Sequence, residues 1–115
     1  MIRLYPELNQ KILEIAEGDE EFKLELTTAI YQGLIELKEV YSDGVEQQDI
    51  VKIQQIRHKV KPTLAMFEFE NLIVEMQKGK EILESDGFTE EFSKHLSEFN
   101  QMLTAAIADV KNLLA

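Results

Sequence analysis

The residues best suited to chemistry are His58 and Lys61, one helical turn apart in the stretch IQQIRHKVKPTLAMF from Ile53 to Phe67. A neutral imidazole nitrogen is a competent nucleophile near neutral pH, because the unperturbed pKa of histidine is about 6.5. A cation one turn away would offset the charge of an anion that the ring attacks or carries. The pair therefore favours capture of an anionic group, such as a phosphoryl group, on His58.

The charge around His58 differs from that of the rest of the chain. The 115 residues carry 22 Asp and Glu against 12 Lys and Arg, a net charge of −10. Residues 50–67 contain no acid, and the short run 52–61 holds Lys52, Arg57, Lys59 and Lys61. The overall acidity argues against general binding to nucleic acid or to an anionic membrane, which needs clustered Lys and Arg. The local lack of acids suits a histidine that carries an anion, and a solvated basic helix face has the same pattern.

The hydrophobic pattern around His58 predicts that its ring points outward. The predicted third helix has an apolar stripe made of Ile53, Ile56, Val60, Leu64 and Phe67. At about 100° per residue, His58 lies about 160° from the centre of this stripe. A mixed basic and apolar patch on that side suggests a docking surface, because the solvent face of a bundle helix is mostly charged. We expect it to contain Val51, Gln54, Gln55, Arg57, Lys59, Pro62, Ala65 and, if the helix stays regular, Phe69.

Other site chemistries fit the sequence poorly. The chain has no cysteine, which excludes disulfides, Cys-ligated zinc and Fe–S clusters. The second histidine, His95, lies on another predicted helix, and neither histidine belongs to the Glu-x-x-His pair of di-iron bundles. We expect His95 on the surface, in contact with Glu91 or Glu98. The glycines are isolated, so no phosphate-binding loop is indicated, and we expect neither a cofactor nor a metal site.

The chain also lacks the marks of membrane insertion or secretion. Charged residues interrupt every apolar run well before the roughly 20 residues that a membrane-spanning helix needs. The opening MIRLYPEL does not have the apolar core of a signal peptide. We therefore expect a cytoplasmic protein that makes no membrane contact. Met1 and a last helix that runs close to Ala115 favour a free-standing protein over a domain cut from a longer chain.

The periodicity is helical throughout and predicts an all-α fold in a single domain, residues 1–115. Four long amphipathic segments with short connections predict an antiparallel up-down four-helix bundle, and a short extra N-terminal helix should cover one end. The boundary residues are Pro6 in the first turn of the short helix, Gly18 at its end, caps at Asp19, Asp49 and Thr89, a turn at Ser42–Gly44, and a helix end at Asp86-Gly87.

Each long helix has a predicted core stripe. In the second helix it is Phe22, Leu26, Ile30 (or Ala29), Gly33, Leu37 and Val40; in the fourth, Leu72, Met76 and Leu83; in the fifth, Phe92, Leu96, Phe99, Leu103, Ala106, Val110 and Leu113. The second helix has a second apolar line, Leu24, Tyr31 and Ile35. We expect the short first helix to cover this line, with a dimer or partner contact as the alternative. A monomer is the simpler expectation.

With His58 in the middle of a helix, the sequence resembles the histidine-containing phosphotransfer (HPt) domains of bacterial phosphorelays. The motif of that family is His-x-x-Lys followed by a small residue on the third helix, and it stands here as His58-Lys59-Val60-Lys61-Pro62. Flanking residues also match, namely Asp49, Ile53 and Ile56 upstream and Ala65, Met66 and Phe67 downstream. GDEEFKLELTTAI (residues 18–30) resembles the family's early helix, so the similarity covers roughly residues 4–113.

The resemblance implies a role for each residue of the motif. It implies that His58 is phosphorylated through its outward ring nitrogen and that Lys61 assists by charge and hydrogen bonding. It implies a phosphocarrier rather than an enzyme, with the receiver domains of response regulators or hybrid kinases as partners. Mg²⁺ is then expected only on the receiver. The alternative is a helical interaction module that uses the same patch without being phosphorylated.

Two residues depart from the family pattern. Pro62 replaces the usual glycine and lacks the N–H that would bond the carbonyl of His58, so we expect a local kink or an exposed carbonyl there. Glu68 stands where the family commonly has glycine at the end of this helix. Because glutamate disfavours a positive φ, we expect the third helix to end differently near residues 67–70 or to continue into the fourth with a bend.

Overall fold

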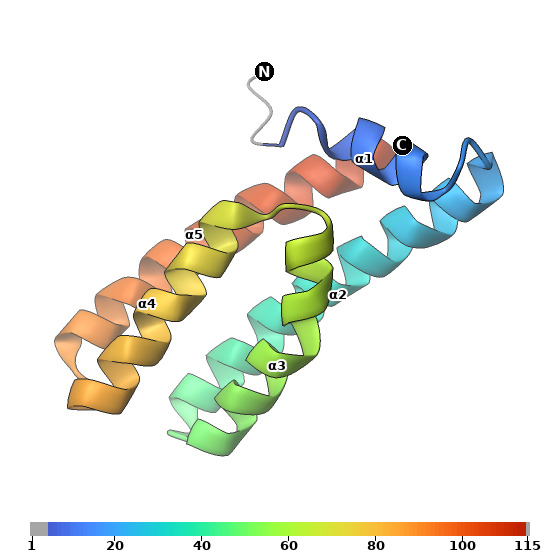
Figure 1. The fold of residues 1–115 in the computed structure, drawn as a ribbon. Coiled ribbons are helices and arrows are strands. Elements are labelled where there is room, and N and C mark those ends of the chain that lie inside the picture. Colours follow the sequence, from blue (N-terminus) through green and yellow to red (C-terminus); the bar gives the residue numbers. More distant parts are fainter. Residues whose placement is uncertain (1–4, 115) are drawn as a thin grey trace.

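The computed structural model describes residues 5–114, and every regular element in that part of the chain is an α-helix (Figure 1). The all-α prediction is therefore confirmed. The helices are α1 (Leu8–Ile15), α2 (Glu20–Glu46), α3 (Ile50–Met66), α4 (Glu70–Asp86) and α5 (Glu90–Leu114).

Each of the four long helices packs against two others. α2 lies against α3 and α5, and α4 lies against the same two helices. Successive long helices run in opposite directions, and α2 and α5 extend beyond the α3–α4 turn toward α1 (Figure 1). The core lies between these helices and includes the rings of Tyr41, Phe92 and Phe99.

The short helix α1 crosses the end of the molecule where α2 begins (Figure 1). Leu8 and Ile12 are its buried residues. The Lys11 ammonium pairs with Glu68 in the α3–α4 turn at 3.2 Å. Pro6 lies just before the helix rather than in its first turn, because α1 begins at Leu8. The apolar spacing also predicted Leu4 as part of this helix, but residues 1–4 lie outside the described part of the chain.

The predicted helix starts are confirmed by capping hydrogen bonds. The side-chain oxygens of Asp19, Asp49 and Thr89 each accept the backbone N–H three residues later, at 3.0, 3.0 and 3.3 Å. Such caps satisfy amide donors that have no partner within the helix. The predicted end of α4 is also confirmed, since the helix stops at Asp86 and Gly87 has a φ of 75°.

The turn predicted at Ser42–Gly44 is wrong, because α2 continues to Glu46. Gly44 is buried inside the helix, where α3 comes close to α2. A Cβ at Gly44 would stand 2.7 Å from the Cγ1 atom of Ile53. The glycine therefore serves close packing rather than a turn, and the real connection follows at residues 47–49.

The buried face of α2 differs in part from the predicted stripe. Ile30 and Leu37 are buried, but the Phe22 side chain is 42% exposed and Ala29 is also exposed. Leu26, Gly33 and Val40 are only half-buried. Since α2 faces both α3 and α5, its buried residues follow an alternating spacing of three and four: Thr27, Ile30, Leu34, Leu37, Tyr41 and Gly44. In the second apolar line Leu24 is 55% exposed, so α1 does not cover that line in full, while Tyr31 and Ile35 are half-buried.

The stripes of the other long helices agree well with the prediction. All five predicted core residues of α3 and all three of α4 are buried. In α5 only Leu96 and Leu113 differ, being half-buried. The buried position between Phe92 and Phe99 is taken by His95 instead of Leu96.

The end of α3 corrects the expectation for Glu68. The helix stops at Met66, and Glu68 has a φ of 58°. The backbone N–H of Phe69 donates to the carbonyl of Leu64 at 2.9 Å, and that of Glu68 donates to Ala65 at 3.2 Å. These two bonds form a Schellman motif, in which a glutamate occupies the left-handed position that favours glycine. Upstream, Pro62 lies inside a continuous helix, and the kink there stays a prediction.

Candidate functional site

His58 is exposed on α3, on the side away from the buried stripe. The outward register predicted from the periodicity is therefore confirmed. Lys61, one turn further along the same helix, is exposed as well. Among the described residues, neither the ring of His58 nor the ammonium of Lys61 has a side-chain hydrogen bond or an ion pair. Both groups are free to meet a ligand.

His58 lines a groove of about 1050 Å³ between α3 and α4. The sequence predicted only the α3 side, because periodicity treats one helix at a time and does not show which neighbour faces it. The α3 wall consists of Gln54, Gln55, Arg57, His58, Lys59 and Lys61, and the α4 wall of Ile73, Val74, Met76, Gln77, Lys78, Lys80, Glu81 and Glu84.

The groove is cationic although the chain is strongly acidic. Five Lys and Arg residues line it, against two Glu residues. Lys59 is held by Glu36 of α2 at 2.6 Å. Lys78 and Lys80 have only long contacts, at 3.8 Å to Glu98 and 4.0 Å to Glu84. Exposed pairs of this length neutralise little charge, so most of the positive charge remains available to an incoming anion.

The side chain of Arg57 lies partly in the groove and partly in the protein interior. Its side chain lines the groove, yet its Nη1 atom is buried and has no hydrogen-bond partner among the described residues. Burial raises the pKa of Tyr41 well above its usual value, the charge of Arg57 acts in the opposite direction, and Glu75 adds a smaller upward effect. The guanidinium group thus reaches from the surface beside His58 toward the buried polar groups of the core.

Seven of the eight predicted docking residues fall into two groups. Gln54, Gln55, Arg57 and Lys59 lie in the groove. Val51, Pro62 and Ala65 are exposed on α3 but outside the groove lining, and Val51 is 59% exposed.

The placement of Phe69 on the docking surface is wrong. Phe69 follows the end of α3, so the helical projection does not apply to it. Its side chain is fully buried, and its ring packs edge-on against that of Tyr5 with the ring centroids 4.6 Å apart. It belongs to the packing beneath α1 and not to the surface around His58.

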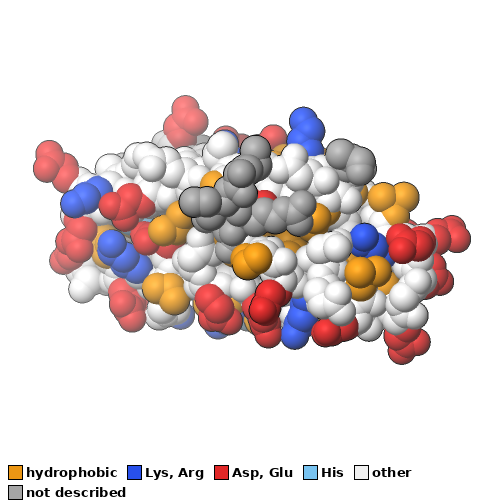
Figure 2. All heavy atoms as spheres, turned by 90° about the horizontal axis from the view of Figure 1, so that it is seen from above, with side chains coloured by type: hydrophobic (Ala, Val, Ile, Leu, Met, Phe, Trp, Pro, Cys, Tyr) orange, Lys and Arg blue, Asp and Glu red, His pale blue; other side chains and the backbone are white. Residues whose placement is uncertain are grey.

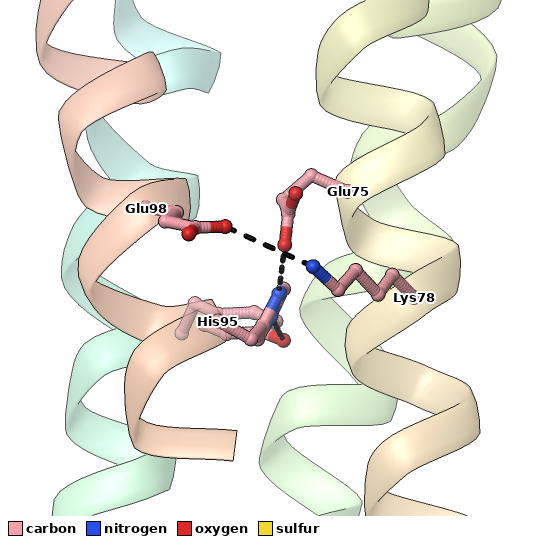
Figure 3. A network of polar contacts seen from close by, with 5 residues as sticks. Glu75, Lys78, His95 and Glu98 are labelled. Carbon is pink, nitrogen blue, oxygen red and sulfur yellow. Dashed lines mark hydrogen bonds and ion pairs between the residues drawn. The ribbon is translucent and has the colours of Figure 1, made fainter. Parts of the chain in front are cut away.

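The predicted surface role of His95 is also wrong, because the side chain is buried within the core. Its Nδ1 atom lies 2.6 Å from the Oε2 atom of Glu75, and its Nε2 atom lies 2.8 Å from the hydroxyl of Tyr41. Figure 3 shows Glu75 of α4 and His95 of α5 pointing toward one another. With a neutral ring, Nδ1–H donates to the carboxylate and Nε2 accepts the tyrosine O–H.

The sequence contains a signal for this buried cluster that was missed. His95 stands three residues after Phe92 and four before Phe99, which is the spacing of the buried stripe of α5. Gly79 of α4 provides the room, since a Cβ there would lie 2.6 Å from Cε1 of the His95 ring and 2.8 Å from Cδ2. Buried charged groups need such partners, and the cluster serves packing across three helices rather than the exposed site.

Residues 5–114 hold no group of three or more His, Asp or Glu side chains placed to share a metal ion. No helix in the same range has the length and apolar character needed to cross a membrane. On the face shown in Figure 2, Asp and Glu side chains lie all around the outline, and hydrophobic side chains form only small separate groups.

Comparison with known proteins does not assign the chain to a family. A scan against models of known protein families gave no match, and searches of curated proteins and of solved structures gave none either.

Proposed function

We propose that this protein is a histidine-containing phosphotransfer domain that carries a phosphoryl group on His58 between receiver domains of a phosphorelay. The observation that carries the proposal is the exposed His58 beside Lys61 in a cationic groove of an otherwise acidic all-α protein. The resemblance of residues 58–62 to the family motif supports the same assignment.

The arrangement of the helices is consistent with this role. We infer that α2, α3, α4 and α5 form an antiparallel up-down four-helix bundle and that α1 is an added end cover. In such a bundle a residue on the outer face of α3 is presented on a rigid element, because the opposite face of α3 is packed through Ile53, Ile56 and Val60. A rigid and exposed ring suits a carrier that must meet more than one partner.

The chemical step that we propose is the transfer of one phosphoryl group from an aspartate of the receiver to His58. A neutral ring nitrogen of His58 attacks the phosphorus atom of an aspartyl phosphate on the receiver. The P–N bond forms as the P–O bond to the aspartyl carboxyl group breaks, and the aspartate leaves as a carboxylate. The phosphorylated ring then releases the proton of its other nitrogen to water. The reverse step passes the phosphoryl group to the next receiver.

The groove residues would assist this transfer by charge. Lys61 offsets the negative charge that gathers on the phosphoryl oxygens, and it has no competing carboxylate partner among the described residues. The receiver would supply Mg²⁺ and most of the catalytic groups, so this chain acts as a phosphocarrier and not as an enzyme. We further propose that it works as a cytoplasmic monomer without contact to nucleic acid or membrane.

A transfer assay tests the proposal. A receiver domain is phosphorylated with ³²P-labelled acetyl phosphate, freed of the small donor and mixed with this protein. We expect label on this protein that is labile to acid and stable to alkali, as phosphohistidine is. A protein that acquires no such label from any receiver of its own organism would contradict the assignment.

The alternative is an interaction module that binds a partner through the groove without being phosphorylated. The exposed Val74 on the α4 wall of the groove is compatible with such binding. Comparing the wild-type protein with a His58→Ala variant separates the two functions. A carrier loses its label in the variant, whereas an interaction module has no label to lose and keeps its partner.

A further inference from the structure

We propose that α4 forms the second half of the docking surface, and that Lys78 and Lys80 attract an acidic face of the receiver while Val74 makes an apolar contact with it. This inference rests on the proposed function and adds a binding surface to it, since the motif at residues 58–62 lies entirely on α3. The partner it calls for is a folded receiver domain with carboxylates placed around a small apolar patch.

The charges of the groove argue for an acidic partner. Lys78 and Lys80 line the groove together with Arg57 and Lys61, so cations stand on both of its walls. The rest of the chain is rich in acids, with 22 Asp and Glu in all. An acidic partner is therefore repelled by most of the surface and attracted to the groove, which guides the encounter toward His58.

The contacts of the two α4 lysines leave them available. The side chains of Lys78 and Lys80 are 54% and 44% exposed. Their carboxylate neighbours lie 3.8 and 4.0 Å away, at the outer limit of an ion pair. A closer carboxylate of a partner can replace such contacts at little cost. Lys59, held at 2.6 Å by Glu36, is less free to do so.

The α4 wall also carries an exposed apolar side chain. Val74 is 66% exposed, the highest fraction among the large exposed hydrophobic residues of the described chain. It lines the groove one turn before Lys78, and Met76 and Ile73 beside it are buried and half-buried. Transient protein interfaces combine apolar contacts with polar and charged ones, so an exposed valine on the same wall as the two lysines suits the proposed docking.

A buried hydrogen bond links α4 to α5 on the side of α4 that faces the core. Glu75 of α4 bonds to the buried His95 of α5 at 2.6 Å (Figure 3). α4 therefore presents its lysines from a fixed backbone. A preformed surface loses less conformational entropy when a partner binds, which favours a fast transient encounter.

The test measures binding separately from transfer. The variants are made in a His58→Gln background, which blocks transfer. Binding of a purified receiver is followed by stopped-flow fluorescence at several salt concentrations. The test variant is Lys78→Glu/Lys80→Glu, with Lys78→Gln/Lys80→Gln as a milder form. The matched control is Lys94→Glu/Lys111→Glu, which makes the same change of net charge at exposed positions of α5 outside the groove.

We expect charge reversal at Lys78 and Lys80 to weaken binding about tenfold or more at low salt and to flatten its salt dependence. The control should stay within about threefold of the parent protein. Val74→Asp should weaken binding at all salt concentrations, whereas Leu24→Asp, at an exposed apolar site on α2, should not. Circular dichroism melting checks that each variant is folded. If the Lys78→Glu/Lys80→Glu variant does not fold, the Lys78→Gln/Lys80→Gln variant replaces it in the binding test.

The outcomes distinguish this inference from the proposed function. If the wild-type protein takes up label but reversal of Lys78 and Lys80 changes binding no more than the α5 control does, the docking inference is wrong and the carrier function stands. If a receiver binds through these lysines but His58 is never labelled, the docking inference stands and the carrier function is wrong. A protein that binds no receiver contradicts both.

Discussion

His58 and His95 show how the same residue type is used in two ways in one small protein. His58 is exposed in a cationic groove, whereas His95 is buried between a carboxylate and a tyrosine hydroxyl. The sequence correctly predicted the exposure of His58, because one helical stripe decides it. It failed for His95, although this residue stands at the spacing of the buried stripe of α5 between Phe92 and Phe99. The residues that make its burial possible, Glu75 and Gly79, lie on another helix.

Replacing His58 by Ala should leave stability almost unchanged. The ring is exposed and stands away from helix caps and core, so the free energy of unfolding should change by about 0.5 kcal/mol or less. Ile56→Ala provides the contrast, because Ile56 is 3% exposed and lies in the core stripe. We expect this change to cost about 2–5 kcal/mol. Urea unfolding measures both, and a His58→Ala variant that unfolds would show that the outward register is wrong.

Lys61→Ala should slow phosphoryl transfer and leave the fold intact. Lys61 is exposed, and its ammonium has no ion pair with the described carboxylates, so its loss removes only charge that the phosphoryl group meets. A roughly tenfold slower transfer would correspond to about 1.4 kcal/mol in activation free energy. Rapid-quench kinetics give the rate. Lys94→Ala on α5 is the control, and equal rates for the two variants would exclude a role for Lys61.

At the scale of the elements, capping residues were predictable and helix ends less so. Asp19, Asp49 and Thr89 cap helices as predicted, because a cap is a local feature. The predicted turn at Ser42–Gly44 failed because Gly44 allows α3 to pack closely. The packing role of Gly44 depends on the position of α3 relative to α2, which the sequence of one helix does not show.

The end of α3 provides a test at this scale. Glu68 has a φ of 58°, which a residue with a side chain adopts at a cost. Glu68→Gly should relieve about 1 kcal/mol of this cost and lose less than that from the exposed pair with Lys11. We expect a small net gain in the free energy of unfolding. Glu68→Ala is the control, since it removes the pair and keeps the unfavourable backbone; if the Gly and Ala variants are equally stable, the left-handed conformation carries no cost.

At the scale of the whole molecule, the buried cluster of Tyr41, His95 and Glu75 joins α2, α5 and α4. The sequence predicted which helices exist and most of their inward faces. It did not predict this polar link or the α4 wall of the groove, because both depend on which helices become neighbours. The residues on the α3 wall of the groove were therefore predictable from the sequence, whereas those on the α4 wall were not.

The buried Tyr41 predicts a loss of stability at alkaline pH. Burial raises its pKa well above the ordinary tyrosine value of 10.0. Above about pH 10 the unfolded chain therefore loses the tyrosine proton while the folded protein keeps it, so stability falls as pH rises. Tyr41→Phe should be about 1–3 kcal/mol less stable at pH 7, because Nε2 of His95 loses its partner. Its stability should then decline less steeply above pH 10 in urea unfolding. An equal decline in both proteins would contradict this role of Tyr41.

The measurement that tests the central claim most directly is the location of the phosphoryl group after transfer. The protein is labelled by a phosphorylated receiver, digested at neutral to alkaline pH and mapped by mass spectrometry. The predicted result is a single phosphohistidine at His58, absent from His58→Gln under the same conditions. Label at another residue, or undiminished label in His58→Gln, would contradict the account.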